Sequence, residues 1–260
     1  MPLYLILQAA LEGYRWIWHR RRDLWPLCFM PLGVKIAGFV LIALLGLSGN
    51  YLRQGLILLP AYFLEGSLVV LAVRLVLFRQ ADLNDPAVKK DLLSGTIIYA
   101  LTKLVTSFFT SAIVARNFQG QGGAAATSDP GAPMFMLALV MFAFTIWAFR
   151  FFWLYVPMAS GISIRQFLRR MRPFIYSIHI AFFWVACFLP PVFILLVILQ
   201  LVSKILPIQG ETLTTVPYEI LTAVLQALAE LTIMLVSASG FAIWMRALFR
   251  GPDRNGLYHL

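Results

Sequence analysis

Residues 174–202 read FIYSIHIAFFWVACFLPPVFILLVILQLV, a run without a single Asp, Glu, Lys or Arg. A helix needs about 20 mostly apolar residues to cross the hydrocarbon core of a bilayer. This stretch is longer than one crossing requires, so it predicts a membrane-spanning helix with tilt or an extension beyond the bilayer. Pro190 and Pro191 each lack a backbone N–H, which predicts a kink or two half-helices near the middle.

Stretches of the same character lie on both sides of this run. They cover residues 24–47, 55–78, 92–115, 133–157 and 217–248. Together the six stretches predict an all-α polytopic membrane protein whose transmembrane domain is 24–248. Residues 1–23 are then an interfacial helix and residues 249–260 a cytoplasmic tail.

The composition supports this class of protein. The chain has 260 residues, of which 61% are hydrophobic and 12% charged, whereas soluble domains average about 45–50% apolar and about 25% charged. These values exclude a disordered chain, an ordinary soluble enzyme and a disulfide-rich secreted scaffold. Cys28 and Cys187 lie in apolar stretches without metal-ligand spacing, and we interpret both as small hydrophobic residues.

The net charge is +10. In a membrane protein the distribution of basic residues between the two sides predicts the orientation, and we predict no nucleic-acid partner. One side of the six spans carries most of the basic loop residues: Arg15, Arg20, Arg21, Arg22, Arg79, Lys89, Lys90, Arg165, Arg169, Arg170, Arg172, Arg246, Arg250 and Arg254. The other side carries Arg53, Arg116 and Lys204. Since cytoplasmic loops are enriched in Lys and Arg, this asymmetry predicts that both termini are cytoplasmic.

Two short amphipathic helices are predicted on the cytoplasmic side. In residues 3–22, polar side chains recur every three or four positions and form one stripe: Gln8, Glu12, Arg15, His19 and Arg22. Residues 162–171, before the fifth span, are similar in kind. Such helices lie in the headgroup plane. The residues Arg20, Arg21, Arg22, Arg165, Arg169 and Arg172 are candidate contacts for anionic phospholipid headgroups, with simple positive-inside anchoring as the alternative.

Two connecting segments have distinct signatures. Asp85-Pro86 is typical of a helix start, with Asp85 as N-cap and Pro86 at the first helical position. Residues 118–133 are rich in Gly, Ala, Gln and Ser, which predicts a flexible external loop.

Charged residues inside the predicted spans are rare and therefore informative. Arg74 lies only about 6 Å from the cytoplasmic end of its span, shallow enough to act as a snorkelling anchor. The third and sixth spans carry polar stripes, and we hypothesise that these stripes face each other or a shared cavity. The candidate intramembrane polar site comprises Lys103, Glu65, Glu230, Lys35, Arg150, Thr106 and Gln226.

Lys103 lies at the middle of the third span's stripe and is expected to pair with Glu65 or Glu230. The alternative is a polar clasp between helices that binds no ligand. The three histidines are scattered, and the sequence has neither an H-E-x-x-H nor a G-x-S-x-G motif. No catalytic, metal-binding or cofactor-binding residue is therefore assigned.

The stretch Arg150-Phe151-Phe152-Trp153-Leu154-Tyr155-Val156-Pro157, followed by Ile164-Arg165-Gln166-Phe167-Leu168, resembles two bacterial six-helix membrane families. These are the YciC-like proteins and the membrane domain of some glycerophosphodiester phosphodiesterases. Both place an Arg, an apolar run and a Pro at the cytoplasmic end of a span, before an amphipathic helix. Where those families often have an acidic residue after the Pro, this chain has Met158-Ala159-Ser160-Gly161. The resemblance implies a protein of the bacterial inner membrane without catalytic residues of its own.

The sequence thus favours a non-catalytic integral membrane protein, an accessory or lipid-associated component that contacts the bilayer and anionic headgroups. A protein partner or a homo-oligomer is compatible with this interpretation. The alternative is a transport component. That component is either the permease subunit of an ABC-type exporter or an ion-coupled carrier that uses Lys103 with Glu65 and Glu230.

Overall fold

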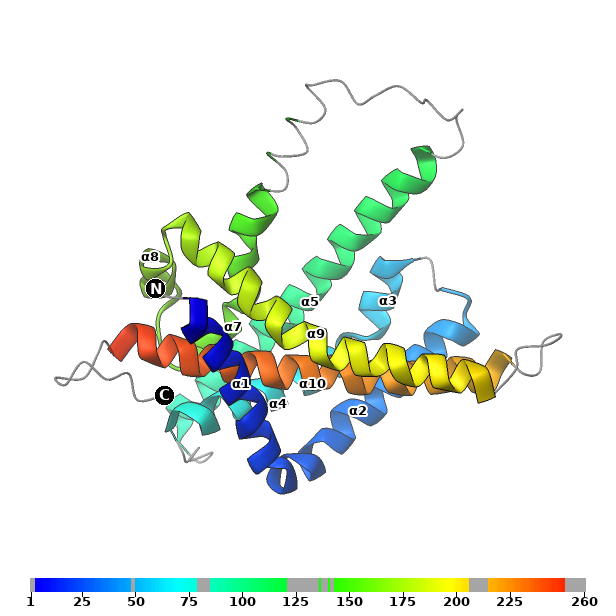
Figure 1. The fold of residues 1–260 in the computed structure, drawn as a ribbon, viewed down its shortest axis with the longest axis horizontal. Helices are drawn as coiled ribbons and strands as arrows, with labels where there is room; N and C mark the ends of the chain where they lie inside the picture. Colours follow the sequence, from blue (N-terminus) through cyan, green and yellow to red (C-terminus); the bar gives the residue numbers. More distant parts are fainter. Residues whose placement is uncertain are drawn as a thin grey trace.

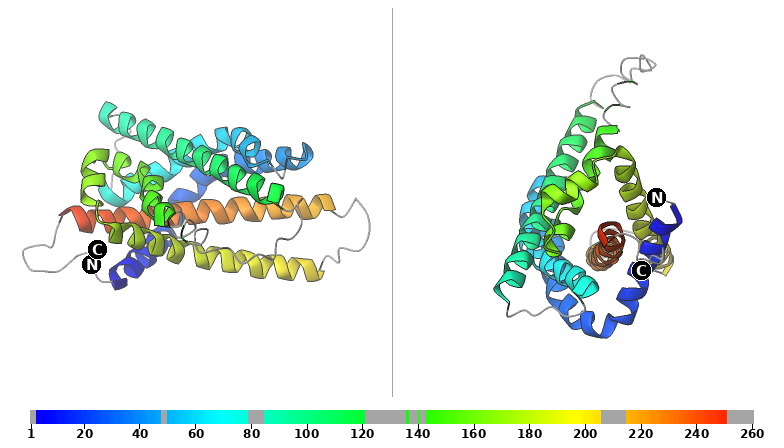
Figure 2. Two further views of the ribbon diagram at one scale, coloured as in Figure 1. Left: turned by 90° about the horizontal axis from the view of Figure 1, so that it is seen from above. Right: turned by 90° about the vertical axis from the view of Figure 1, so that its left-hand side faces the viewer.

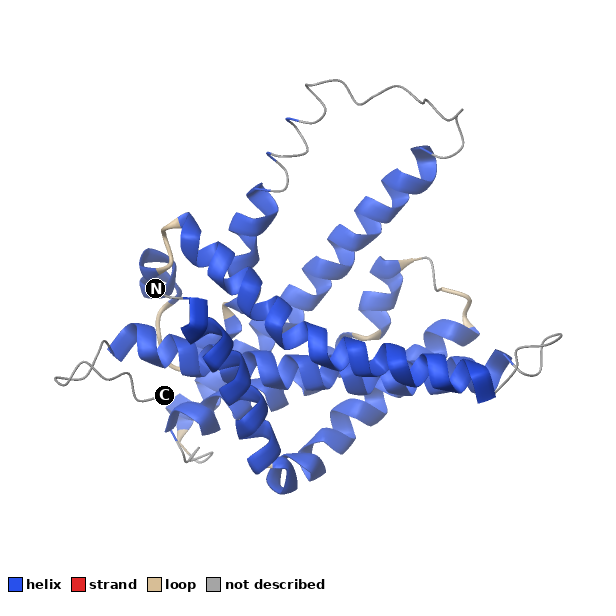
Figure 3. Ribbon diagram, in the orientation of Figure 1, coloured by secondary structure: helices blue, strands red, loops and turns tan. Residues whose placement is uncertain are grey.

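The computed structural model describes residues 3–47, 50–78, 85–120, 136, 140, 143–205 and 215–250. All regular secondary structure in these ranges is helical (Figures 1 and 3). The elements in chain order are α1 (Leu3–His19), α2 (Arg21–Leu44), α3 (Tyr51–Ile57), α4 (Leu59–Phe78), α5 (Pro86–Gly120), the 3₁₀-helix η1 (Phe149–Trp153), α7 (Tyr155–Ala159), α8 (Ile164–Arg170), α9 (Phe174–Ile205) and α10 (Thr215–Arg250).

Five of the described helices are long and apolar enough to cross a membrane. The qualifying segments are Arg21–Leu44, Leu59–Phe78, Pro86–Phe109, Phe174–Val202 and Ile220–Phe249. The predicted fourth span, 133–157, lies partly outside the described residues, and what is described there is a shorter apolar helix, Ala143–Ala159. The all-α prediction is therefore confirmed, and five of the six predicted spans are found. The predicted loop 118–133 and tail 249–260 lie largely outside the described residues.

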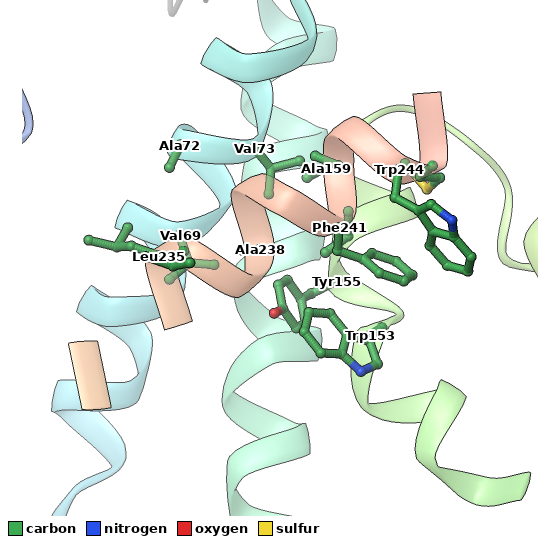
Figure 4. Packing of buried hydrophobic residues seen from close by; sticks show 14 of the residues in the cluster. Val69, Ala72, Val73, Trp153, Tyr155, Ala159, Leu235, Ala238, Phe241 and Trp244 are labelled. Carbon is green, nitrogen blue, oxygen red and sulfur yellow. The ribbon is translucent and has the colours of Figure 1, made fainter. Parts of the chain in front are cut away.

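The helix α10 forms the axis of the bundle. It contacts α1, α2, α4, α7 and α9, and the view along α10 shows the other helices around it (Figure 2). Small residues let α4 and α10 approach closely, with Ala72 and Ala238 fully buried. Aromatic side chains fill the space next to this contact, where the rings of Trp153 and Phe241 are tilted by 31° with centroids 4.8 Å apart (Figure 4).

Helix boundaries follow the backbone chemistry of particular residues. The predicted second span is divided at Leu58 into α3 and α4, because Pro60 has no N–H to continue the ladder. The predicted start of α5 is confirmed, since the Asp85 carboxylate accepts a 2.8 Å hydrogen bond from the Ala87 amide. Pro190 and Pro191 lie inside α9, which stays one helix and changes direction along its length (Figure 1).

The helix α1 packs across α9 and α10 (Figure 1). Its buried face comprises Leu5, Ile6, Ala9, Ala10 and Gly13. Its remaining surface is divided lengthwise into an apolar row and a polar row. Tyr4, Leu7, Leu11 and Trp18 are exposed on the apolar row, and Gln8, Arg15 and His19 are exposed on the polar one. A helix divided in this way suits a boundary between hydrocarbon and water.

Arg74 is not the exposed anchor that its shallow position predicted. It is buried, and its Nη1 donates to Asp91 Oδ2 on α5 at 3.1 Å and to the Ala159 carbonyl on α7 at 3.0 Å. The reason is that α4 is covered by neighbouring helices on several sides, so a side chain at this end of α4 meets protein before it reaches solvent. Arg74 thus joins α4, α5 and α7 at one end of the bundle.

Candidate functional site

The charged residues inside the bundle converge on Lys35, in the second half of α2. Its Nζ lies 2.9 Å from Oε2 of Glu65 on α4 and 2.7 Å from Oε2 of Glu230 on α10. Lys35 and Glu65 are 1% and 0% exposed. One ammonium group therefore joins three helices through two short ion pairs. We call Lys35, Glu65 and Glu230 the ionic cluster.

The second oxygen of each carboxylate is also hydrogen-bonded. The Tyr99 hydroxyl of α5 donates to Oε1 of Glu65 at 2.7 Å, and Nε2 of Gln226 donates to Oε1 of Glu230 at 2.9 Å. Charges are tolerated in a bundle interior when they are paired and their remaining acceptors are satisfied. The Glu230 side chain is 33% exposed, so the cluster has one accessible edge.

Lys103 does not form the expected ion pair with Glu65 or Glu230. Both carboxylates bind Lys35 instead, because α2 inserts that ammonium between α4 and α10. The Lys103 Nζ lies 5.7 Å from the centroid of the Tyr99 ring. Within the described part of the chain it makes no hydrogen bond and no ion pair. The two carboxylates act on Lys103 only through longer-range charge.

Lys103 borders a cavity of about 170 Å³ among α5, η1, α7, α9 and α10, which we call the aromatic pocket. Its lining is mostly aromatic: Tyr99, Thr102, Lys103, Thr106, Phe149, Phe152, Trp153, Tyr155, Trp184 and Met234. The indole Nε1–H of Trp153 is sealed off from the cavity and has no hydrogen-bond partner among the described residues. The pocket wall thus carries one charged donor, on Lys103, that no described protein group engages.

Arg150 lies apart from the ionic cluster. Its guanidinium donates to the Met171 carbonyl at 2.9 Å and lies 4.4 Å from the centroid of the Trp147 ring. It therefore ties η1 to the end of α8. The predicted polar site is thus divided in the structure. Four of its residues come together in or next to the ionic cluster: Lys35, Glu65, Glu230 and Gln226. Lys103 and Thr106 line the aromatic pocket, and Arg150 belongs to neither group.

The basic residues of α8 form an exposed surface around a hollow of about 840 Å³. Its lining comprises Ser163, Arg165, Gln166, Leu168, Arg169 and Arg172. Phe167 and Met171 are fully buried beneath and fix the helix to the bundle. We call Arg165, Arg169 and Arg172 the α8 arginine surface. None of the three forms an ion pair with a residue that the structure describes.

The arginines at the α1–α2 junction are exposed but have local partners. Nη1 of Arg20 lies 3.2 Å from Oδ2 of Asp23, and Nη1 of Arg21 donates to the Trp18 carbonyl at 3.0 Å. Arg22 is exposed as well. This group therefore has less charge available for a ligand than the α8 arginine surface has. Among the described residues no three His, Cys, Asp or Glu side chains are grouped in a way that suits a metal ion.

Sequence reasoning missed most of the aromatic pocket. Residues 147–155 contain six aromatic side chains, and this density was the available signal. Periodicity did not reveal it, because η1 is a 3₁₀-helix followed directly by α7. Tyr99 is not among the predicted site residues, although its hydroxyl donates to Glu65 of the ionic cluster.

Five helices of spanning length and apolar composition, three of which are joined by a buried ionic cluster, are compatible with an integral membrane protein. Comparison of the chain with protein-family models, with curated proteins and with solved structures finds no match in any of the three. The resemblance to YciC-like proteins and to phosphodiesterase membrane domains therefore stays a hypothesis, based on the residues around Arg150 and Pro157.

Proposed function

We propose that this chain is an accessory, lipid-associated protein of a bacterial inner membrane, with both termini cytoplasmic and no catalytic role. Its α8 arginine surface binds the headgroups of anionic phospholipids. The observation that carries the proposal is the combination of three exposed arginines around one hollow with a buried Phe167–Met171 face. Basic residues next to a membrane attract anionic lipid at about 1 kcal/mol each.

The headgroup proposal predicts selective loss of lipid binding in the double variant Arg165→Gln/Arg169→Gln. Removing two basic residues is expected to cost about 2 kcal/mol, a roughly 30-fold weaker affinity for phosphatidylglycerol. The measurement is native mass spectrometry of the full-length protein with phosphatidylglycerol and phosphatidylcholine. The matched control is Lys89→Gln/Lys90→Gln, which removes the same charge from exposed residues of α5. Equal losses in the two variants would show general charge attraction and would contradict a local site.

The proposed orientation predicts the accessibility of single cysteines in intact cells. A membrane-impermeant thiol reagent is expected to label Gln121→Cys from outside and to leave Gln166→Cys unlabelled until the cells are opened. The native Cys28 and Cys187 are both buried, so they give little background. Labelling of position 166 alone from outside would reverse the orientation and place the α8 arginine surface on the wrong side.

A second candidate is an ion-coupled carrier, favoured by the accessible edge of the ionic cluster at Glu230. A carboxylate that is one-third exposed and bound to a buried lysine suits a group that exchanges an ion or proton between helices. Ion or substrate flux into proteoliposomes that is lost in Glu230→Gln would favour the carrier. Co-purification of an ATPase would instead favour the permease alternative. Tightly bound phospholipid without flux supports the lipid-associated protein.

A further inference from the structure

The aromatic pocket combines an apolar cavity with the ammonium of Lys103, which has no described hydrogen-bond partner. Three hydroxyls of the lining are already engaged. The hydroxyls of Thr102 and Thr106 donate to the backbone carbonyls of Ile98 and Thr102, and that of Tyr99 donates to Glu65. Lys103 supplies the charged donor that remains for a ligand.

The chemistry of the wall selects an apolar monoanion. One ammonium faces a cavity whose other walls are aromatic rings and Met234, and the nearest carboxylates are already bound to Lys35. Lys103 is the one charged residue of the pocket lining, so a ligand with one negative charge can pair with it directly. A carboxylate accepts a charge-assisted hydrogen bond from an ammonium group, which is the stronger kind of hydrogen bond.

The size and the surroundings of the pocket favour a lipid-derived acid. A cavity of about 150 Å³ holds one benzene molecule, so about 170 Å³ holds only a short length of hydrocarbon. The remainder of a longer chain has to extend along the outer surface of the bundle. Val105 on α5 and Val185 on α9, the sequence neighbours of the lining residues Thr106 and Trp184, are apolar and 46% and 41% exposed. A two-chain phospholipid is too large for the cavity itself.

We propose that the aromatic pocket binds a long-chain fatty acid from the bilayer, with its carboxylate on Lys103 and the adjacent hydrocarbon against Phe152, Trp153 and Trp184. This site is separate from the α8 arginine surface and does not depend on the headgroup proposal.

The test uses the full-length protein in nanodiscs and a photoreactive palmitic acid analogue, with cross-linked peptides located by mass spectrometry. Labelling is expected within residues 147–155 and 181–187 and is expected to be displaced by palmitate. Because a charge-assisted hydrogen bond contributes strongly to binding, Lys103→Met is expected to weaken binding about 10- to 100-fold. Trp153→Phe, which replaces the indole by a smaller ring and leaves the charge of Lys103 in place, is expected to weaken it less.

The controls separate this site from general lipid contact. Lys90→Met makes the same substitution at an exposed position of α5 and is expected to bind like the wild type, as is the Arg165→Gln/Arg169→Gln variant. Hexadecanol, which has the same chain without the charge, is expected to compete at least 10-fold less well than palmitate. Unchanged labelling in a folded Lys103→Met protein, or equal competition by hexadecanol, would overturn the proposal. Displacement by phosphatidylglycerol but not by palmitate would assign the pocket to phospholipid instead.

Discussion

The variant Lys35→Met is expected to lose about 3–5 kcal/mol of the free energy of unfolding, the usual cost of removing one partner from a buried ion pair. Methionine has a similar length, so the substitution removes charge with little loss of volume. It leaves Glu65 fully buried and Glu230 partly buried, both without the cation that now lies within 3 Å of each. The measurement is reversible unfolding of the purified protein in mixed micelles.

The control for this prediction is Lys103→Met, the same substitution on a lysine that has no described ion pair. Its expected effect on the free energy of unfolding is below about 1 kcal/mol. The contrast matters because both lysines lie inside predicted spans and carry the same charge. Equal stability of the two variants would mean that the ionic cluster contributes nothing specific to the fold.

A triple variant distinguishes unpaired charge from a general loss of contacts. Lys35→Met/Glu65→Gln/Glu230→Gln removes all three charges and keeps amides that accept from Tyr99 and Gln226. Replacing an entire buried ion cluster by neutral groups is often nearly neutral for stability. The triple variant is therefore expected to recover most of what Lys35→Met loses. A triple variant as unstable as the single one would show that the ion pairs themselves hold the helices together.

The sequence predicts the type and the approximate position of most helices, because hydropathy and backbone chemistry act locally. The Asp85-Pro86 start of α5 and the apolar runs of α2, α9 and α10 are found as expected. The division between α3 and α4 was not predicted, although Pro60 marks it. Hydropathy is averaged over a window as long as a span, and a break of one residue does not change that average.

The site was predicted in composition but not in connectivity. Glu65, Glu230 and Lys35 were all selected as intramembrane charges, yet the choice of Lys103 as their partner was wrong. Which lysine reaches the carboxylates depends on how α2, α4 and α10 are rotated about their axes, and periodicity within one helix does not determine that. The contacts of Arg74 could not be predicted for the same reason, because its partners Asp91 and Ala159 come from two other helices.

A cluster of small residues on α10 predicts a helix interface without identifying the other helix. The cluster comprises Ala238, Ser239, Gly240 and Ala242. Such residues are typical of helix interfaces but do not name the helix that they contact. In the structure Gly240 lies against α1, since a Cβ built on it would be 2.7 Å from the Ala9 carbonyl oxygen. On the facing helix, a Cβ on Gly13 would be 2.6 Å from the Val236 carbonyl oxygen. The two backbones are therefore in direct contact at this crossing.

We expect Gly240→Ala to lower the free energy of unfolding by about 2–3 kcal/mol, near the upper end of the usual cost of overpacking. The obstacle is a backbone carbonyl, which moves only if α1 moves as a whole. The matched control is Gly33→Ala in α2, where a Cβ would have nothing within 4 Å. There alanine is expected to be neutral or to stabilise the helix by up to about 1 kcal/mol.

Separating α1 from α10 is expected to have a local signature as well as a global one. Besides the glycine crossing, α1 is held by the Tyr14 hydroxyl, which donates to the Cys187 carbonyl of α9 at 2.7 Å. In Gly240→Ala, backbone amides of α1 are expected to exchange hydrogen faster than in the wild type, while those of α4 keep their protection. For Gly38→Ala we expect a loss of unfolding free energy between those of the other two variants. The added Cβ would meet the flexible Leu58 side chain, which can move aside more easily than a backbone carbonyl. If Gly240→Ala matched Gly33→Ala in both stability and exchange, α1 would not be docked on α10 as described.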